Sequence, residues 1–418
     1  MGVTVAALMF LRLPPDTRNT VWAEDGSRFL TGALNEPMPQ VLVQPYAGYL
    51  HVVPRLAAWL ATAAPTPSIA LALNVVNCAV VGVIAAVVYV SIASLMASRV
   101  VRAWLVLMTA LLPVVGVEAA GTAANLHWFF LWGLFWVSWH QARDRTPALA
   151  LALFTFAGAM TEIQSVLLLP LALAVQVRRR PASRWSWAPV VAWAVGYLAQ
   201  IVATLSAPRP QSFELPAPVR LAQMFAMQVV LPLLSADPHA LRSLLLRFGW
   251  VLALIVAVPL AAAAGYALVR ANVLLKAVTL LAGMYALTLF TLAVTVNPER
   301  VLTRSAGRLA VHGPLLTRYG LVPSLLVVSF VAVAAQTALS RRQVRAGVPL
   351  AGLAVLLAMA GAMSLQSPGN RRDPATSWPA RMASARAACE ISGARAVHVP
   401  VSPTANWSVL LPCRRVLT

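Results

Sequence analysis

Charged residues are scarce in this chain of 418 residues. Asp, Glu, Lys and Arg together make up 11%, against roughly 25% in an ordinary soluble domain. Hydrophobic residues make up 60%, and the mean hydropathy is +0.77. This composition excludes a soluble globular enzyme and a disordered chain. Cysteine is also rare. The chain has three cysteines in all, which are too few for a disulfide scaffold or a zinc ribbon.

Acidic residues are the scarcer charged class, with 12 against 32 basic ones and a net charge of +20. In a soluble protein this excess would suggest nucleic acid. In a membrane protein, basic loops at the membrane surface explain it better. We therefore expect membrane lipids, and not nucleic acid, as partners.

Long apolar runs recur along the chain, and spanning a bilayer takes roughly 20 apolar residues per helix. The sequence predicts an all-α polytopic membrane protein with about 11 transmembrane helices. The first run is short and starts almost at Met1, which is compatible with an incomplete N-terminus. It lacks the features of a cleaved signal peptide. Another short pair forms either two thin crossings or one broken hairpin. The runs are 3–13, 68–97, 103–117, 124–141, 147–160 (first of that pair), 164–177 (second), 185–206, 248–269, 274–296, 319–339 and 347–365.

Basic residues in the short loops set the expected orientation. If the runs alternate, these loops share one face, which the positive-inside rule assigns to the cytoplasm. We predict a multi-pass protein of the cell (plasma) membrane with a cytoplasmic N-terminus and an extracytoplasmic C-terminus. The loop residues are Arg99, Arg102, Arg143, Arg145, Arg178, Arg179, Arg180, Arg184, Arg270, Lys276, Arg341, Arg342 and Arg345.

The outer face then carries four segments. Residues 50–64 are amphipathic and are expected to lie flat on the membrane. Residues 220–234 are apolar although both flanks must be outside, so we interpret them as a re-entrant or interfacial helix; the alternative is an extra crossing. The predicted domains are a transmembrane region 1–365, with outer loops 14–67, 207–247 and 297–318, and an extracytoplasmic tail 366–418.

The tail differs from the rest of the chain because it concentrates charge and alternates polar with apolar residues from Ala396 onward. This pattern predicts a small appendage that contains β-structure. Cys389 and Cys413 both lie there, in an oxidising compartment under this topology, and are predicted to form a disulfide. Cys78 lies inside an apolar run and is interpreted as a buried small hydrophobic residue.

Two acids follow the first apolar run directly, in the sequence Val21-Trp-Ala-Glu-Asp-Gly. Successive helical residues point about 100° apart, so Glu24 and Asp25 cannot face one substrate atom as a symmetrical pair. One can act as a base while the other holds a metal, a basic residue or the backbone. The alternative is a helix N-terminus stabilised by acids.

A second polar stretch, residues 118–128, is predicted to form a tight outer turn. It concentrates a carboxylate (Glu118), an amide (Asn125), an imidazole (His127) and an indole (Trp128). Trp128 alone fits the aromatic belt of a membrane interface, and His127 alone fits a structural histidine. Together the four side chains favour a substrate-binding pocket, since ionisable groups at membrane depth are usually retained for a partner or a pathway.

Three further residues are candidates at helix ends. Glu162 interrupts apolar sequence, where a break needs cover from protein or water; a solvated turn is the alternative. Arg318, followed by Tyr319, precedes a late apolar run and offers a donor fork suited to phosphate; an interfacial anchor is the alternative. Arg55 is a similar candidate.

The acidic pair after the first helix, the Glu…Asn-x-His-Trp turn, the Arg-Tyr before a late helix and the outer tail together resemble the GT-C superfamily of membrane glycosyltransferases. The resemblance implies transfer of a sugar, with inversion, from a polyprenyl-phosphate carrier to an envelope glycan, lipid or protein on the outer face. It implies a catalytic role for Glu24 and Asp25. Arg318, His127 and Arg55 would stabilise the leaving phosphate. A divalent metal could assist, but no residues have a spacing that names its ligands. This chain has a shorter first helix and a smaller tail than larger members.

Two other functions remain open. A transporter or flippase for lipid-linked glycans would need a polar path through both leaflets, often with inverted repeats, and the chain shows no internal repeat. A non-catalytic scaffold of an envelope-polymer complex is the other alternative.

Overall fold

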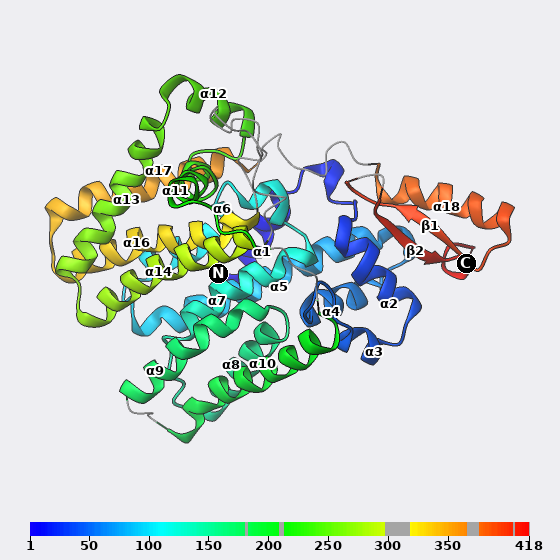
Figure 1. Ribbon diagram of the computed structural model, residues 1–418, viewed down its shortest axis with the longest axis horizontal. Helices are drawn as coiled ribbons and strands as arrows, with labels where there is room; N and C mark the ends of the chain where they lie inside the picture. The colour runs from blue at the N-terminus through cyan, green and yellow to red at the C-terminus, as the bar shows by residue number, and fades with distance from the viewer. Residues whose placement is uncertain (180–182, 209–212, 297–317, 366–375, 404–405, 418) are drawn as a thin grey trace. The chain divides into compact units, whose positions relative to one another are not determined.

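The computed structural model describes the whole chain except residues 180–182, 209–212, 297–317, 366–375, 404–405 and 418, together with the side chain of Val117. The chain folds into two compact units, each built from separate stretches of sequence. The first unit comprises residues 88–119 and 210–369 with Met1, and the second comprises residues 2–87, 120–209 and 370–418. Figure 1 shows the elements by label and by colour along the chain.

Long apolar helices dominate the first unit. The helix α16 (Leu321–Ser340) is almost wholly buried and packs against four others. Side-chain caps begin several helices; the Asn272 carboxamide, for example, accepts the N–H of Leu275 at the start of α14. The other helices are α6 (Arg99–Leu111), α11 (Pro218–Phe225), α12 (Pro238–Phe248), α13 (Val251–Arg270), α14 (Val273–Thr295) and α17 (Val344–Met363).

Shorter helices make up most of the second unit, whose helical pair α8 and α10 packs closely along its length. The helix α5 (Ile69–Ser91) begins in this unit and ends in the first. The other helices are α1 (Gly2–Leu11), α2 (Thr31–Asn35), α3 (Met38–Val43), α4 (Val52–Ala61), α7 (Leu126–Val137), α8 (Arg145–Ala159), α9 (Leu169–Arg179), α10 (Ala188–Ser206), α18 (Trp378–Ser392) and α19 (Arg414–Leu417).

The helical membrane fold is confirmed in its coarse form, and the number of crossings is not. Six described helices are long and apolar enough to span a bilayer, within the segments Thr66–Ser94, Arg184–Ser206, Val251–Arg270, Val273–Thr295, Arg318–Ser340 and Val344–Met363. The other five predicted runs form shorter helices. The longest of these, α8, has 15 residues, which at about 1.5 Å per residue falls short of a hydrocarbon core of about 30 Å. The count of 11 therefore stays a prediction.

The predicted re-entrant stretch 220–234 is helical but sharply broken. Pro218–Leu233 and Pro238–Phe248 meet at a bend of 118°, next to a short turn in which the Asp237 carboxylate caps α12. The pair fits either a broken span or a re-entrant loop, so both sequence alternatives remain. The stretch predicted to lie flat forms α4, whose Trp59 and Leu60 are exposed while its opposite face is buried.

The tail forms the predicted β-structure. Strand β1 (Ala396–Pro400) pairs antiparallel with β2 (Ser408–Pro412), with Val397 opposite Leu411. Cys389 in α18 and Cys413 after β2 form the predicted disulfide, and Cys78 is buried as expected. The sequence predicts that residue 365 is the boundary between the transmembrane region and the outer tail, and this stays a prediction. In the structure the described part of the tail packs within the second unit.

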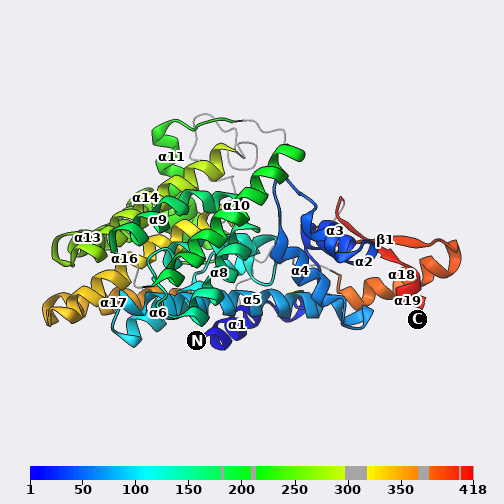
Figure 2. The ribbon, with the colours of Figure 1, turned by 90° about the horizontal axis from the view of Figure 1, so that it is seen from below.

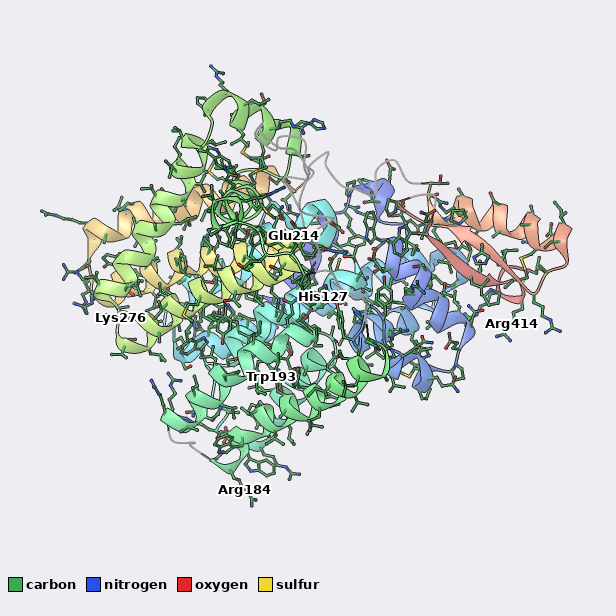
Figure 3. The ribbon with its side chains drawn as sticks, viewed as in Figure 1. His127, Arg184, Trp193, Glu214, Lys276 and Arg414 are labelled. Carbon is green, nitrogen blue, oxygen red and sulfur yellow. A yellow bond between two sulfur atoms is a disulfide. The ribbon has the colours of Figure 1, made fainter. Side chains whose placement is uncertain are left out.

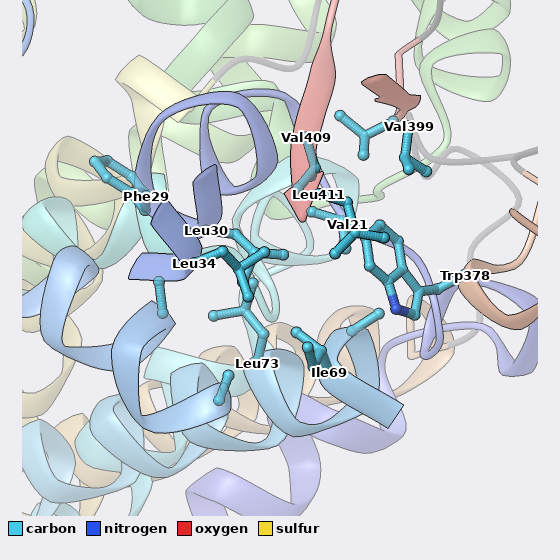
Figure 4. Close-up of a cluster of buried hydrophobic side chains, with 14 of the residues drawn as sticks. Val21, Phe29, Leu30, Leu34, Ile69, Leu73, Trp378, Val399, Val409 and Leu411 are labelled. Atoms are coloured by element: carbon cyan, nitrogen blue, oxygen red, sulfur yellow. The ribbon is translucent and has the colours of Figure 1, made fainter. Parts of the chain in front are cut away.

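The tail shares a hydrophobic core with residues that lie between Val21 and Leu73. Trp378, completely buried, packs with tail valines and leucines against Val21, Leu30 and Ile69, as Figure 4 shows. Its indole N–H donates to the carbonyl of Thr66. The helix α2 packs against strand β2, and Figure 2 shows this part of the second unit from a second direction.

Candidate functional site

The acidic pair opens a helix that begins at Ala23 and passes through a π-helical turn, Asp25–Leu30, into α2. Such turns occur often at functional sites. Both acids are buried, with 8% of Glu24 and 1% of Asp25 exposed. The tail packs on this helix so closely that a Cβ on Gly26 would lie 3.0 Å from Val409.

Asp25 accepts two backbone hydrogen bonds. Its Oδ2 accepts the N–H of Ala123 and its Oδ1 accepts the N–H of Ala124, each at 2.8 Å. These donors begin the short 3-10 turn Ala123–Asn125 that leads into α7. Asp25 therefore holds the backbone, which is one of the roles expected for a member of the pair. Glu24 is then the better candidate for the base.

The turn that Asp25 holds carries three predicted site residues. Asn125 donates from its amide to the Thr122 hydroxyl at 2.7 Å. His127 lies inside the second unit with 7% of its surface exposed and is labelled in Figure 3. The ring of Trp128 lies against that of His127, with centroids 4.3 Å apart. The first polar stretch thus meets residues 123–128 of the second stretch within one unit.

Glu162 is the partner of His127. Its Oε2 pairs with Nδ1 of His127, and its Oε1 accepts the N–H of Gln164 at 2.7 Å. Only 1% of Glu162 is exposed. The interruption of helical structure at Glu162 is therefore covered by protein. Such cover is what an interruption at membrane depth would require. The neighbouring Thr161 hydroxyl accepts the N–H of Val53 at the start of α4.

Arg55 lies on the buried face of α4 with 2% of its surface exposed. Its guanidinium carbon lies 5.7 Å from the centre of the Phe29 ring. Among the residues that the structure describes, no acceptor lies within hydrogen-bond distance of its Nε or Nη1. Burial is the main cause that lowers the pKa of Arg55 to about 10, so the group stays charged at neutral pH.

His51 is a neighbour that sequence reasoning missed. Its ring stacks near Tyr49 at 4.1 Å and Phe29 at 5.6 Å, and lies 6.5 Å from His127. Burial, and then the electrostatic influence of His127 and of Arg55, hold the pKa of His51 well below its usual range. The signal was available in the sequence, since the chain has only six histidines and this one stands four residues before Arg55.

Two predicted site residues pair in the first unit. Arg318 Nη1 lies 3.3 Å from Glu118 Oε1, and the Arg318 guanidinium lies over the Tyr319 ring at 5.8 Å. Glu118 lies on a π-helical turn, Val115–Ala119. The structure thus divides the 118–128 stretch, with Glu118 in the first unit and Asn125, His127 and Trp128 in the second. The predicted convergence of both groups on one cavity stays a prediction.

Metal ligands were left open by the sequence. Within the described ranges no group of three or more His, Cys, Asp or Glu side chains is arranged to hold a metal ion. Comparisons with models of protein families, with curated proteins and with solved structures found no match. The GT-C resemblance therefore depends on the arrangement of residues alone.

Proposed function

We propose that this chain is a membrane glycosyltransferase of the GT-C type. It transfers a sugar from a polyprenyl phosphate to a glycan, lipid or protein of the cell envelope on the outer face, with inversion. The observation that carries the proposal is the hydrogen-bonded junction of Asp25 with Ala123 and Ala124. This junction joins the acidic pair to the turn that bears Asn125, His127 and Trp128.

In the proposed reaction Glu24 is the base. An inverting transfer needs one carboxylate to remove the proton of the acceptor hydroxyl as its oxygen attacks the anomeric carbon. The bond from that carbon to the phosphate oxygen breaks through an oxocarbenium-like state, as in glycoside cleavage. Asp25 fixes the turn, and with it the position of His127.

The leaving lipid phosphate gains charge, so fixed cations should stabilise it. The sequence nominates Arg318, His127 and Arg55. Arg318 and His127 are each paired with a carboxylate, Glu118 and Glu162. Arg55 has no carboxylate within ion-pair distance among the described residues. These facts favour Arg55 as the cation that meets phosphate.

The test is sugar transfer in membranes that contain the purified protein and a panel of polyprenyl-phosphate sugars with an envelope extract as acceptor. Glu24→Gln should lower transfer about 100-fold or more, since general-base catalysis contributes roughly that much. Its thermal midpoint should match the wild type. Asp25→Asn should lower both transfer and stability, because the amide cannot accept both N–H groups.

Glu390→Gln is the matched control, since that acid lies in the tail at an exposed i,i+4 pair with Arg386. It should leave transfer unchanged. Full transfer by Glu24→Gln would remove the catalytic assignment. Movement of labelled lipid-linked sugar across liposomes without any transfer would instead favour a flippase.

A further inference from the structure

The state of the His51 ring follows from its hydrogen bond. Nε2 of His51 lies 3.2 Å from the carbonyl oxygen of Tyr46. A carbonyl only accepts, so Nε2 must carry the hydrogen. The ring is buried, and the charge of Arg55 acts on it, which favours its neutral form. Nδ1 is then a bare acceptor nitrogen, and it has no partner among the described residues.

Arg55, four residues later, offers hydrogen-bond donors where His51 offers an acceptor. Its Nε and Nη1 are buried donors for which the described part of the chain supplies no acceptor. A buried donor without a partner is costly, and more so when it is charged. Arg28 and Glu36 are the charged side chains whose fields reach Arg55. An oxyanion bound across the edge of Nη1 and Nη2 would satisfy Nη1. Nε faces the other edge, which it shares with Nη2, and needs an acceptor of its own.

The two side chains share one neighbour. His51 precedes α4 and Arg55 lies in its first turns, with the Arg55 N–H donating to the His51 carbonyl at 3.1 Å. Both side chains lie against the Phe29 ring, whose centre is 5.6 Å from the His51 ring and 5.7 Å from the Arg55 guanidinium. A hydroxyl acceptor and an anion donor therefore both lie beside one buried aromatic ring.

We propose that His51 and Arg55 form a recognition site for a phosphorylated sugar. The Arg55 Nη1, with Nη2 beside it, donates to phosphate oxygens, and the His51 Nδ1 accepts from a hydroxyl of the attached sugar. The identification of the ligand as the lipid-linked donor rests on the proposed function. The recognition of a phosphate together with a hydroxyl does not rest on it. The phosphate is assigned to Arg55 and not to Arg318, because Glu118 neutralises Arg318.

Binding, measured without transfer, tests the site. Purified protein in nanodiscs is titrated with farnesol, farnesyl phosphate, and farnesyl phosphate carrying mannose, glucose or ribose. The wild type should bind farnesyl phosphate more tightly than farnesol, and at least one sugar form more tightly still. Arg55→Gln should weaken farnesyl phosphate binding about 10-fold or more, the value of a charge-assisted hydrogen bond, and leave farnesol unchanged.

His51→Gln separates the two halves of the site. Its amide N–H can replace the Nε2 donor to Tyr46, while the Nδ1 acceptor is lost. We expect unchanged affinity for farnesyl phosphate and loss of the preference for the sugar form. Arg28→Gln, a neighbouring guanidinium stacked over Tyr46 at 5.3 Å, is the matched control and should weaken binding less than about 3-fold.

Mannose 1-phosphate and ribose 5-phosphate distinguish the source of the ligand. Competition by either at the affinity of the lipid forms would assign the site to soluble sugar phosphates. Equal farnesyl phosphate binding by wild type and Arg55→Gln, or a sugar preference retained in His51→Gln, would overturn the proposal. Absence of any phosphate preference in the wild type would also overturn it.

Arg55→Lys decides the matter if Arg55→Gln fails to fold, because it keeps the charge and loses the fork; unchanged binding in that variant counts against the site. The result is separable from the proposed function. Arg55-dependent binding with no dependence of transfer on Glu24 would leave the site and remove the enzyme.

Discussion

The two units of the chain handle buried polar groups differently. In the first unit, long helices bury apolar side chains around α16, and the predicted site residues form one partly shielded pair, Arg318 with Glu118. In the second, short helices bury a chain of polar groups: Asp25, His51, Arg55, His127 and Glu162. Burying such groups costs free energy unless they are satisfied. The two units thus differ in how many of the predicted site residues they bury.

The largest expected effect would sharpen this comparison through the tail core. Trp378→Ala removes a completely buried indole and its hydrogen bond to Thr66. We expect a loss of about 3–5 kcal/mol. Hydrogen exchange should rise in peptides from α2 and α4 and stay unchanged in α13 and α16. Equal increases in both sets would show that the units do not unfold separately.

The disulfide comes next. Cys413→Ser opens the link to Cys389, which closes a separation of 24 residues, and should cost about 3 kcal/mol. Thermal melting under non-reducing conditions measures the effect, and wild type with reductant should match the variant. Cys78→Ala is the control, and reductant should lower its melting temperature as much as that of the wild type, because this variant keeps the disulfide. A reductant-insensitive wild type would contradict the prediction.

Acid should weaken the second unit through His51. Its pKa is lowered in the folded state, so below the unfolded value of about 6.5 the unfolded chain binds a proton that the folded chain does not. The contribution of the neutral His51 ring to the free energy of unfolding is therefore complete above about pH 6.5. It falls by up to about 1.4 kcal/mol per pH unit as the pH drops toward the folded pKa. The ionisable side chains that influence the ring are His127 on α7 and Arg55 on α4; His127 pairs with Glu162, and Arg28 acts on Arg55.

Thermal melting of the wild type and of His51→Gln between pH 7.5 and 5.5 isolates the contribution of His51 to the loss of stability in acid. The variant should lose less stability on acidification than the wild type. Parallel curves would show that His51 does not titrate in this way.

The smallest effect tests the first unit. A double-mutant cycle of Glu118→Gln and Arg318→Gln should give a coupling of about 1 kcal/mol or less, because the pair is partly exposed, at 8% and 17%. The measurement is thermal melting of the four proteins. A coupling several-fold larger would make this unit as dependent on polar pairing as the second, and the comparison would fail.

Local patterns carried the parts of the fold that could be predicted. The long runs became the six helices of spanning length, and the alternation after Ala396 became β1. The disulfide of Cys389 and Cys413 followed from composition and compartment. The short runs were harder, because helices covered by protein, such as the entirely buried α7, need not match the bilayer in length.

The site depended on contacts that no local pattern encodes. Asp25 meets residues 98 and 99 positions away, and Arg318 meets Glu118 across 200 positions. Residue type predicted that acids and cations would pair, but not which with which. His51 was missed because a single histidine is unremarkable until a carbonyl fixes its tautomer and an arginine adjoins it.

The parallel bridge between Trp22 and Ser402, with the Trp378 N–H donating to the Asn19 carbonyl, has a consequence for biosynthesis. The stretch before the acidic helix takes its final conformation only after residues 378–402, made much later in translation, have reached it. Until then Val21 and Leu30 lack the cover that Figure 4 shows. A chain that stops before residue 378 therefore lacks the tail side of this core, while Asn74 can still donate to the carbonyls of Arg18 and Thr20.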